Sequence, residues 1–136
     1  MSDIKYGQEQ GLSPDEFIAV LTASGLAERR PIADRGRIER MLKNANLIVT
    51  ARDGKGRLVG VSRALTDFSY CCYLSDLAVD KALQGRGIGK ILVSETRRLA
   101  GPEAMCLLLS APDSMPFYRS IGMPQPDNAF LFKRER

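Results

Sequence analysis

The segment LQGRGIGK, residues 83–90, constrains the fold more than any other part of this chain. It contains three glycines within five positions, Gly85, Gly87 and Gly89. They follow an apolar run typical of a β-strand and precede a periodic run typical of a helix. Glycine lets other groups approach the backbone closely, and the first N–H groups of a helix attract anions. With Arg86 and Lys90 adding positive charge, we predict a phosphate-binding turn between a strand and a helix.

Two common phosphate-binding motifs do not fit these residues. A P-loop requires G-x-x-x-x-G-K-[ST], but Gln84 stands at the first glycine and Ile91 follows the lysine. A dinucleotide-binding fingerprint requires a third glycine where the chain has Lys90. The pattern that remains is Q-x-x-G-x-G. A tight turn alone needs one glycine, so three glycines beside two cations favour phosphate binding over simple packing.

The remaining pattern predicts one domain, residues 1–136, with a mixed sheet and helices on its faces. The first helix begins at Pro14, because Ser13 and Glu16 have capping-box spacing, and Gly25 can end it. Ile88, Ile91, Leu92 and Leu99 are expected to face inward from the helix after the glycines. A short strand before the first helix is left open. Further helices are predicted at 34–44, 88–99 and 113–122, and strands at 46–53, 57–67, 68–79, 104–110 and 128–134.

Composition excludes several classes of catalytic and metal site. The chain has no histidine, which removes Ser-His-Asp and Cys-His nucleophile systems and most zinc sites. Its three cysteines, Cys71, Cys72 and Cys106, are an odd number, and adjacent cysteines on a strand point to opposite faces. We therefore predict packing roles for the cysteines and no metal site.

Charge and hydropathy narrow the partners and the location. The net charge of +4 favours anionic partners, either nucleic acid or a phosphorylated cofactor. Basic and aromatic residues are not interleaved, so we do not expect nucleic-acid binding. No apolar run approaches the ~20 residues needed to span a bilayer, and the sequence MSDIKYGQEQ lacks signal-peptide features. These observations predict a cytoplasmic protein with no membrane partner.

The segment LAVDKALQGRGIGKILV, residues 77–93, resembles the acetyl-CoA signature of the GNAT superfamily of N-acetyltransferases. In that family, a Q/R-x-x-G-x-G/A loop holds the pyrophosphate of coenzyme A. The segment FYRSIGM, residues 117–123, resembles the late FYxxxGF element, and the order of elements extends the resemblance over essentially the whole chain. The resemblance implies an α/β (α+β) fold: a mixed, mostly antiparallel sheet, helices on both faces and a splayed cleft for the cofactor.

The resemblance also implies a set of residues that bind acetyl-CoA. The glycine loop would hold the pyrophosphate through backbone amides, and the end of the preceding strand would offer backbone groups to the pantetheine arm. An amide near Leu77 would stabilise negative charge on the acetyl oxygen during attack by an amine. The implied binding residues are Leu77, Ala78, Val79, Gln84, Gly85, Arg86, Gly87, Ile88, Gly89 and Lys90.

Tyr118 and Asp76 are the implied catalytic residues. Tyr118 matches a tyrosine that in many members protonates the leaving thiolate, and a phenol with a pKa of about 10 carries that proton at pH 7. The alternative is a core aromatic whose hydroxyl bonds to backbone. Asp76 is placed to accept a proton from the amine, which is largely protonated at pH 7. An aspartate satisfied by local backbone at a strand bulge is an equal alternative.

Several positions depart from the family or remain open. Ala111 stands where many members have an asparagine, and Ser110 or Ser114 is a candidate substitute. The segment GMPQPD is shorter than the usual closing hairpin, which favours a more open acceptor pocket. The charged residues Glu28, Arg29, Arg30 and Asp34 are candidates for the acceptor rim, although solvated loop charges are the favoured explanation for all four.

Three hypotheses follow from the sequence. The first is an acetyl-CoA-dependent N-acetyltransferase that moves an acetyl group to a primary amine of a small molecule or protein by direct attack on the thioester. The second is a non-catalytic acyl-CoA-binding or regulatory module. The third, based only on net charge, is a nucleic-acid or protein-interaction domain. A homodimer is compatible with the chain, because symmetric dimers are the commonest oligomers.

Overall fold

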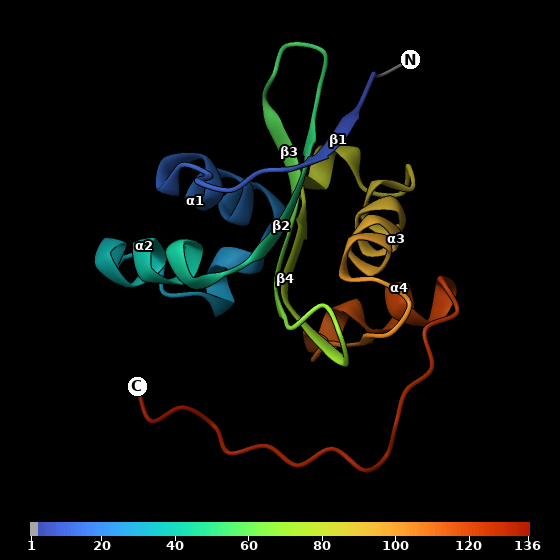
Figure 1. The fold of residues 1–136 in the computed structure, drawn as a ribbon. Coiled ribbons are helices and arrows are strands. Elements are labelled where there is room, and N and C mark those ends of the chain that lie inside the picture. The colour runs from blue at the N-terminus through green and yellow to red at the C-terminus, as the bar shows by residue number, and fades with distance from the viewer. Residues whose placement is uncertain (1–2) are drawn as a thin grey trace.

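A five-stranded sheet forms the centre of the computed structural model, which describes residues 3–136 (Figure 1). The strands lie in chain order and pair antiparallel from β1 to β4, whereas β4 and β5 are parallel. This confirms the predicted mixed, mostly antiparallel sheet and the optional first strand. The strands are β1 (Lys5–Gln8), β2 (Leu47–Arg52), β3 (Leu58–Thr66), β4 (Cys71–Val79) and β5 (Met105–Leu107).

Helices cover both faces of the sheet, as the sequence predicted. Helices α1 and α2 lie on one side of the strands and α3 on the other (Figure 1). The α-helices are α1 (Pro14–Ser24), α2 (Arg35–Asn44), α3 (Ile88–Ala100) and α4 (Met115–Ser120). Short 3-10 turns are η1 (Leu26–Arg29), η2 (Lys81–Leu83) and η3 (Pro112–Ser114). None of the helices in residues 3–136 is both long and apolar enough to cross a membrane.

Local capping explains where the first two helices begin. The hydroxyl of Ser13 accepts a hydrogen bond from the N–H of Glu16 at 3.3 Å, and Asp34 accepts one from the N–H of Arg37 at 3.1 Å. Gly25 ends α1 in the left-handed conformation, with φ of 89°. These side chains satisfy backbone donors that the helices leave unpaired. The predicted bounds of α1 and α2 are therefore confirmed to within one residue.

The two faces of the sheet bury two separate apolar clusters. Phe17 and Leu21 of α1 pack with Ile48 on one face. Ile88 and Leu92 of α3 pack with the other face. Strands β2 and β3 are buried along almost their whole length, because helices cover both of their faces.

Two expectations from the sequence are wrong. Ile91 was expected to face inward, but its side chain is 41% exposed, because the buried stripe of α3 follows Ile88, Leu92 and Thr96. Residues 128–134 were expected to form a strand, yet they pair with no strand in the described chain. Their sequence favours a strand, but a strand needs a partner, and this segment runs away from its own sheet (Figure 1).

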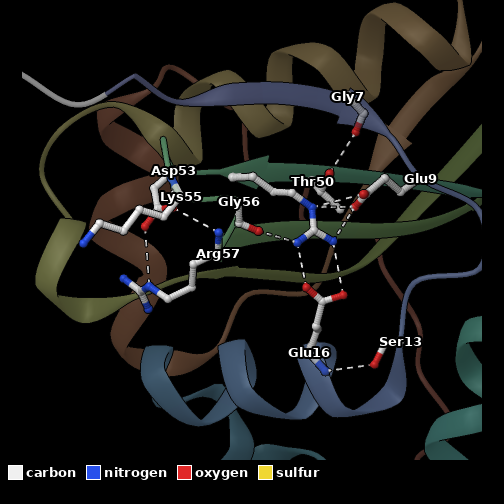
Figure 2. A network of polar contacts seen from close by, with 10 residues as sticks. Gly7, Glu9, Ser13, Glu16, Thr50, Asp53, Lys55, Gly56 and Arg57 are labelled. Atoms are coloured by element: carbon white, nitrogen blue, oxygen red, sulfur yellow. Dashed lines mark hydrogen bonds and ion pairs between the residues drawn. The ribbon is translucent and has the colours of Figure 1, made fainter.

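Arg52, at the end of β2, links α1 and the segment after β1 to the sheet. Its guanidinium bonds to Glu9, to Glu16 of α1 and to the carbonyl of Gly56, the groups drawn around it in Figure 2. The shortest contact to Glu16 is 2.6 Å, and the arginine side chain is 22% exposed. Hydrogen bonding to Arg52 lowers the pKa of Glu16, against the opposing effect of burial.

We predict that Arg52→Gln lowers the free energy of unfolding at pH 7 by about 1 kcal/mol, since solvent screens partly exposed ion pairs. The folded-state pKa of Glu16 lies below its ordinary value. The ion pair therefore contributes its full stability at pH values above the ordinary pKa of Glu16. This stability is lost as the pH falls through the lowered pKa that Glu16 has in the folded protein. Urea unfolding of both proteins at pH 7 and in acid would measure the difference, which should shrink in acid.

Arg98→Gln is the matched control, because Arg98 pairs with Glu95 at 2.7 Å on an exposed helix surface. It should leave the urea midpoint unchanged at both pH values. An equal effect of the two substitutions would contradict the role given to the Arg52 network.

Candidate active site

The glycine loop is fastened to the sheet by Asp80. One carboxylate oxygen of Asp80 accepts from the N–H of Ala82 at 2.9 Å, and the other accepts from Arg57 at 2.9 Å. The same contacts, the amide first, lower the pKa of Asp80. The backbone N–H of Asp80 donates to the carbonyl of Val59 on β3 at 2.9 Å. Neither Asp80 nor Arg57 was predicted from the sequence to support the loop, although an aspartate that can accept from the N–H two residues later is a recognisable turn signal.

The start of α3 is open to an incoming anion. Gly85 and Gly87 have φ of +83° and +85°, and a side chain built on either glycine would meet nothing within 4 Å. Gly87 caps α3 without any side-chain hydrogen bond, unlike Ser13 on α1 and Asp34 on α2. The first N–H groups of α3 therefore have no side-chain acceptor and carry the positive end of the helix dipole. This geometry is what a phosphate-binding turn requires.

Gly89 has a different role from the other two glycines of the loop. A Cβ on Gly89 would lie 2.9 Å from Cζ of Phe117, so no larger residue fits without movement of that ring. Gly89 thus allows α4 to pack directly against the start of α3. Phe117 in turn packs edge-on against Tyr118, with ring centroids 5.0 Å apart. The ring of Phe117 therefore packs against both the glycine loop and Tyr118, the predicted catalytic tyrosine.

A bulge in β4 directs the end of that strand toward the cleft. Arg63 pairs with Asp76 but Ala64 pairs with Leu74, which leaves Ser75 as the extra residue. Beyond the bulge, the N–H of Asp80 donates to the carbonyl of Val59, so every second residue of β4 bonds to β3. Ala78 is therefore bonded to β3, whereas Leu77 and Val79 direct their backbone groups away from it.

Strand β5 does not close this edge. It pairs with β4 only from Cys71 to Tyr73, so the two strands separate where the bulge begins. The carbonyl of Val79 accepts from the side chain of Gln84 at 2.9 Å. The backbone groups of Leu77 remain without a strand partner in the described chain, as the splayed cleft predicted from the family resemblance requires.

A cavity of about 530 Å³ occupies this gap and brings most of the predicted residues together. Gln84, Lys90 and Tyr118 line it, together with residues that were not predicted as site residues, among them Leu83 and Phe117. Ala78 and Arg86 do not line it; Ala78 is only 2% exposed and pairs with β3. The other predicted residues on its wall are Leu77, Val79, Gly85, Gly87, Ile88 and Gly89.

Tyr118 lies half-buried on the wall of the cavity. Burial raises the pKa of Tyr118 to about 12, while the nearby charge of Arg30 acts in the opposite direction. Within residues 3–136, the hydroxyl of Tyr118 forms no hydrogen bond. Every fully buried side-chain oxygen in the same range does form one, so this hydroxyl is not fully buried. The hydroxyl is therefore accessible from the cavity. The alternative of a core tyrosine bonded to backbone does not match this geometry.

Asp76 lies behind the cavity wall and is 1% exposed. Arg30 binds one of its carboxylate oxygens and Arg63 binds the other. Both arginines also bond to Ser75, Arg30 to its carbonyl at 2.8 Å and Arg63 to its hydroxyl at 3.0 Å. The base role of Asp76 stays a prediction, and this double ion pair weighs against it, because both carboxylate oxygens already accept hydrogen bonds from arginines.

Comparison with known proteins identifies the family. A model described as the acetyltransferase (GNAT) family matches residues 15–123. The chain belongs to the acetyltransferase (GNAT) family. The uncharacterised N-acetyltransferase ycf52 of Pyropia yezoensis is 29% identical over 105 residues. That match covers 73% of this chain and 59% of the relative, so the chain corresponds to little more than half the length of that relative.

Solved structures show the same fold. A Staphylococcus aureus protein described as a protein of unknown function and probable acetyltransferase has a TM-score of 0.78 and 22% identity, covering 97% of this chain and 99% of that chain. An aminoglycoside N-acetyltransferase solved in complex with CoA has a TM-score of 0.75 and 14% identity, with coverage of 100% and 97%. The GNAT resemblance and the fold predicted from the sequence are thereby confirmed.

We predict that Gly89→Ala lowers the free energy of unfolding by about 1–3 kcal/mol, since the added methyl group collides with Phe117. Phe117→Leu should recover much of this loss in the double variant, because the smaller side chain leaves room for the methyl group. Denaturant unfolding of the two single variants and the double variant measures the coupling.

Gly36→Ala provides the matched control. Gly36 holds the same second position in α2, and its added Cβ would make only ordinary contacts, at 3.6 Å or more. That variant should be as stable as the original protein or slightly more stable. Additive effects of Gly89→Ala and Phe117→Leu would show that the two residues are not in contact.

Proposed function

We propose that the protein is an acetyl-CoA-dependent N-acetyltransferase that transfers an acetyl group to a primary amine by direct attack of the amine on the thioester. One observation supports this most: the uncapped start of α3, the unpaired edge of β4 and Tyr118 all line one cavity. An anion site, an extended backbone edge and a proton donor are the three features that such a transfer needs. Family membership supports the same proposal.

The residues present fit coenzyme A. The cavity of about 530 Å³ lies within the usual range for ligand sites. Its loop end offers open backbone N–H groups and Lys90, which suit a pyrophosphate, and its β4 end offers the backbone groups of Leu77 to an amide-containing chain. When bound, acetyl-CoA supplies an acetyl thioester. The aminoglycoside N-acetyltransferase with CoA, which shares the fold, supports this choice of donor.

The chain's own groups would then perform three tasks. The N–H of Leu77 points toward the cleft, where it would donate a hydrogen bond to an oxygen and stabilise negative charge on it. The hydroxyl of Tyr118 would donate its proton to the leaving sulfur. The amine must lose a proton, and since the oxygens of Asp76 are held by Arg30 and Arg63, water is the favoured first acceptor. The acceptor would be an amine of a small molecule or a protein.

We predict that Gly87→Val weakens acetyl-CoA binding at least tenfold. Valine is strained at the φ of +85° found at Gly87, so the N–H groups of the loop would move. Isothermal titration calorimetry measures the affinity directly. In the unchanged protein, acetyl-CoA at 100 times its Kd should add about 2.7 kcal/mol of stability.

Gly11→Val is the control for backbone strain, because Gly11 has φ of +79° and also lies in open space, but outside the cavity. It should lose stability and keep its acetyl-CoA affinity. Equal affinity in the Gly87 variant and the unchanged protein would remove the loop from the donor site.

We predict that Tyr118→Phe lowers kcat by about 10²- to 10⁴-fold, as expected for loss of a general acid, without changing acetyl-CoA affinity. Because the pKa of Tyr118 is about 12, its proton is lost only as the pH rises through that value. The unchanged enzyme should therefore gain activity from neutral pH to about pH 10, as the amine loses its proton, with no decline caused by Tyr118.

Tyr6→Phe is the matched control: burial also raises the pKa of Tyr6, which lies on β1 and does not line the cavity. Asp76→Asn should reduce stability more than kcat; the reverse would make Asp76 the base. Full turnover by the Tyr118 variant would exclude the acid role. Acetyl-CoA binding with no turnover of any amine would favour the non-catalytic module instead.

A further inference from the structure

The guanidinium group of Arg30 uses only part of its hydrogen-bonding capacity. An arginine side chain carries five N–H donors. In Arg30, Nε donates to the carboxylate of Asp76, Nη1 to the carbonyl of Arg29 at 2.8 Å and Nη2 to the carbonyl of Ser75 at 2.8 Å. Each terminal nitrogen therefore keeps one N–H that has no acceptor within residues 3–136. The side chain is 21% exposed, so the group is bound to the sheet without being sealed from solvent.

The cluster around Asp76 has an excess of positive charge. Arg30 and Arg63 both pair with Asp76, and within the described chain neither arginine pairs with a second carboxylate. Asp76 and Arg63 are buried, so solvent screens the excess charge only weakly. An anionic group that reached the two open N–H donors of Arg30 would neutralise this charge and accept charge-assisted hydrogen bonds.

Arg30 lies on the face of the sheet opposite the cavity. Side chains alternate along a strand, so Asp76 and Ala78 share one face and Leu77 takes the other. Ala78 packs with the apolar cluster under α1 and α2, whereas Leu77 packs with the α3 cluster and lines the cavity. Because Arg30 binds Asp76, its guanidinium is on the side of α1 and α2. A donor bound in the cavity leaves this side of the gap to the acceptor.

The guanidinium also lies next to the gap in which transfer would occur. Strand β5 pairs with β4 only as far as Tyr73, and Arg30 bonds to Ser75, two residues further along β4. Burial raises the pKa of Tyr118 and the charge of Arg30 opposes that effect, so the two side chains are near one another. The carbonyl of Ser75 lies at most about 7 Å from the N–H of Leu77, since a strand rises about 3.3 Å per residue. A carboxylate on Arg30 and an amine beside Leu77 can thus belong to one small molecule.

An apolar wall adjoins Arg30 on the same face. Tyr73 of β4 and Leu107 of β5 are paired across the strands, and the residues before them, Cys72 and Cys106, pack with the α3 cluster. Tyr73 and Leu107 therefore face the side of α1 and α2, where they are 37% and 38% exposed. An aromatic ring and a leucine at the point where the two strands separate suit an apolar side chain of a ligand.

We propose that the acceptor is an α-amino acid with an apolar side chain. Its carboxylate binds the two open N–H groups of Arg30, its side chain packs on Tyr73 and Leu107, and its amine points into the gap toward Leu77. This inference rests on the proposed acetyl transfer and specifies its acceptor. A polyamine fits poorly, because it would bring positive charge to a cluster that already has an excess of it.

Leucine, leucinamide and 3-methylbutylamine test the carboxylate directly, because they share one side chain and differ in the group that Arg30 would bind. With acetyl-CoA as donor, we expect kcat/KM to be about 10- to 100-fold higher for leucine than for either of the other two, as for hydrogen bonds to a charged group. Spermidine, a polyamine, should also be a poorer substrate than leucine. Equal kcat/KM for leucine and leucinamide would overturn the inference and leave the transfer itself standing.

Isothermal titration calorimetry provides a second readout, which needs no turnover. N-acetylleucine carries the carboxylate of the expected product and should bind about 10- to 100-fold more tightly than N-acetylleucinamide. Absence of turnover with leucine and with every other amine would overturn the proposed function. Equal affinities of the two acetylated compounds would overturn the carboxylate site, whatever the outcome of the turnover assay.

Arg30→Gln should abolish the preference for the carboxylate. Glutamine can still donate to Asp76 and Arg63 keeps its own contact, so we expect a folded protein of lower stability, checked by circular dichroism. The ratio of kcat/KM for leucine to that for 3-methylbutylamine should fall from about 10–100 to about 1. A merely structural loss would lower both values and keep their ratio.

Arg35→Gln is the matched control. It breaks another arginine–aspartate pair, that of Arg35 with Asp15 on the exposed surface of α2 and α1, and should leave the ratio unchanged. A ratio that is the same in Arg30→Gln as in the unchanged protein would overturn the inference.

Discussion

The carboxylate of Asp76 lies between the guanidinium groups of Arg30 and Arg63, and the cleft depends on this buried ion pair. It joins the residue after η1 to β3 and β4, and it also holds Ser75, the bulged residue. The bulge turns the backbone of Leu77 toward the cleft. Removing one partner would leave an unpaired buried charge, which typically costs about 3–5 kcal/mol. Burying these charges costs free energy of desolvation, and the cluster in turn fixes the strand geometry at which β4 and β5 separate.

Two parts of the cavity wall are built by different means. At the glycine loop, two glycines with positive φ and a helix start without a side-chain cap leave backbone N–H groups free. At Tyr118, burial raises the pKa of the phenol to about 12, so a hydroxyl that is already protonated at neutral pH stays protonated in more alkaline solution. These features suit the anion site and the proton donor of the proposed transfer, and neither uses a histidine.

Local signals in the sequence predicted much of the fold and of the site. Ser13 and Gly25 bracket α1, and the glycine pattern marks the start of α3, because caps and positive φ are properties of a few adjacent residues. Arg30 and Arg63 were not foreseen as partners of Asp76, since they stand 46 and 13 residues away in the chain. Residues 128–134 have the composition of a strand, but composition does not specify the partner that a strand requires.

The contact between Gly89 and Phe117 restricts how the sequence can drift. A larger residue at position 89 has no space unless position 117 becomes smaller at the same time. Because the ring of Phe117 packs against Tyr118, such a paired change also moves the tyrosine. Descendants of this sequence are thus expected to change positions 89 and 117 together, or neither, for as long as Tyr118 must keep its place.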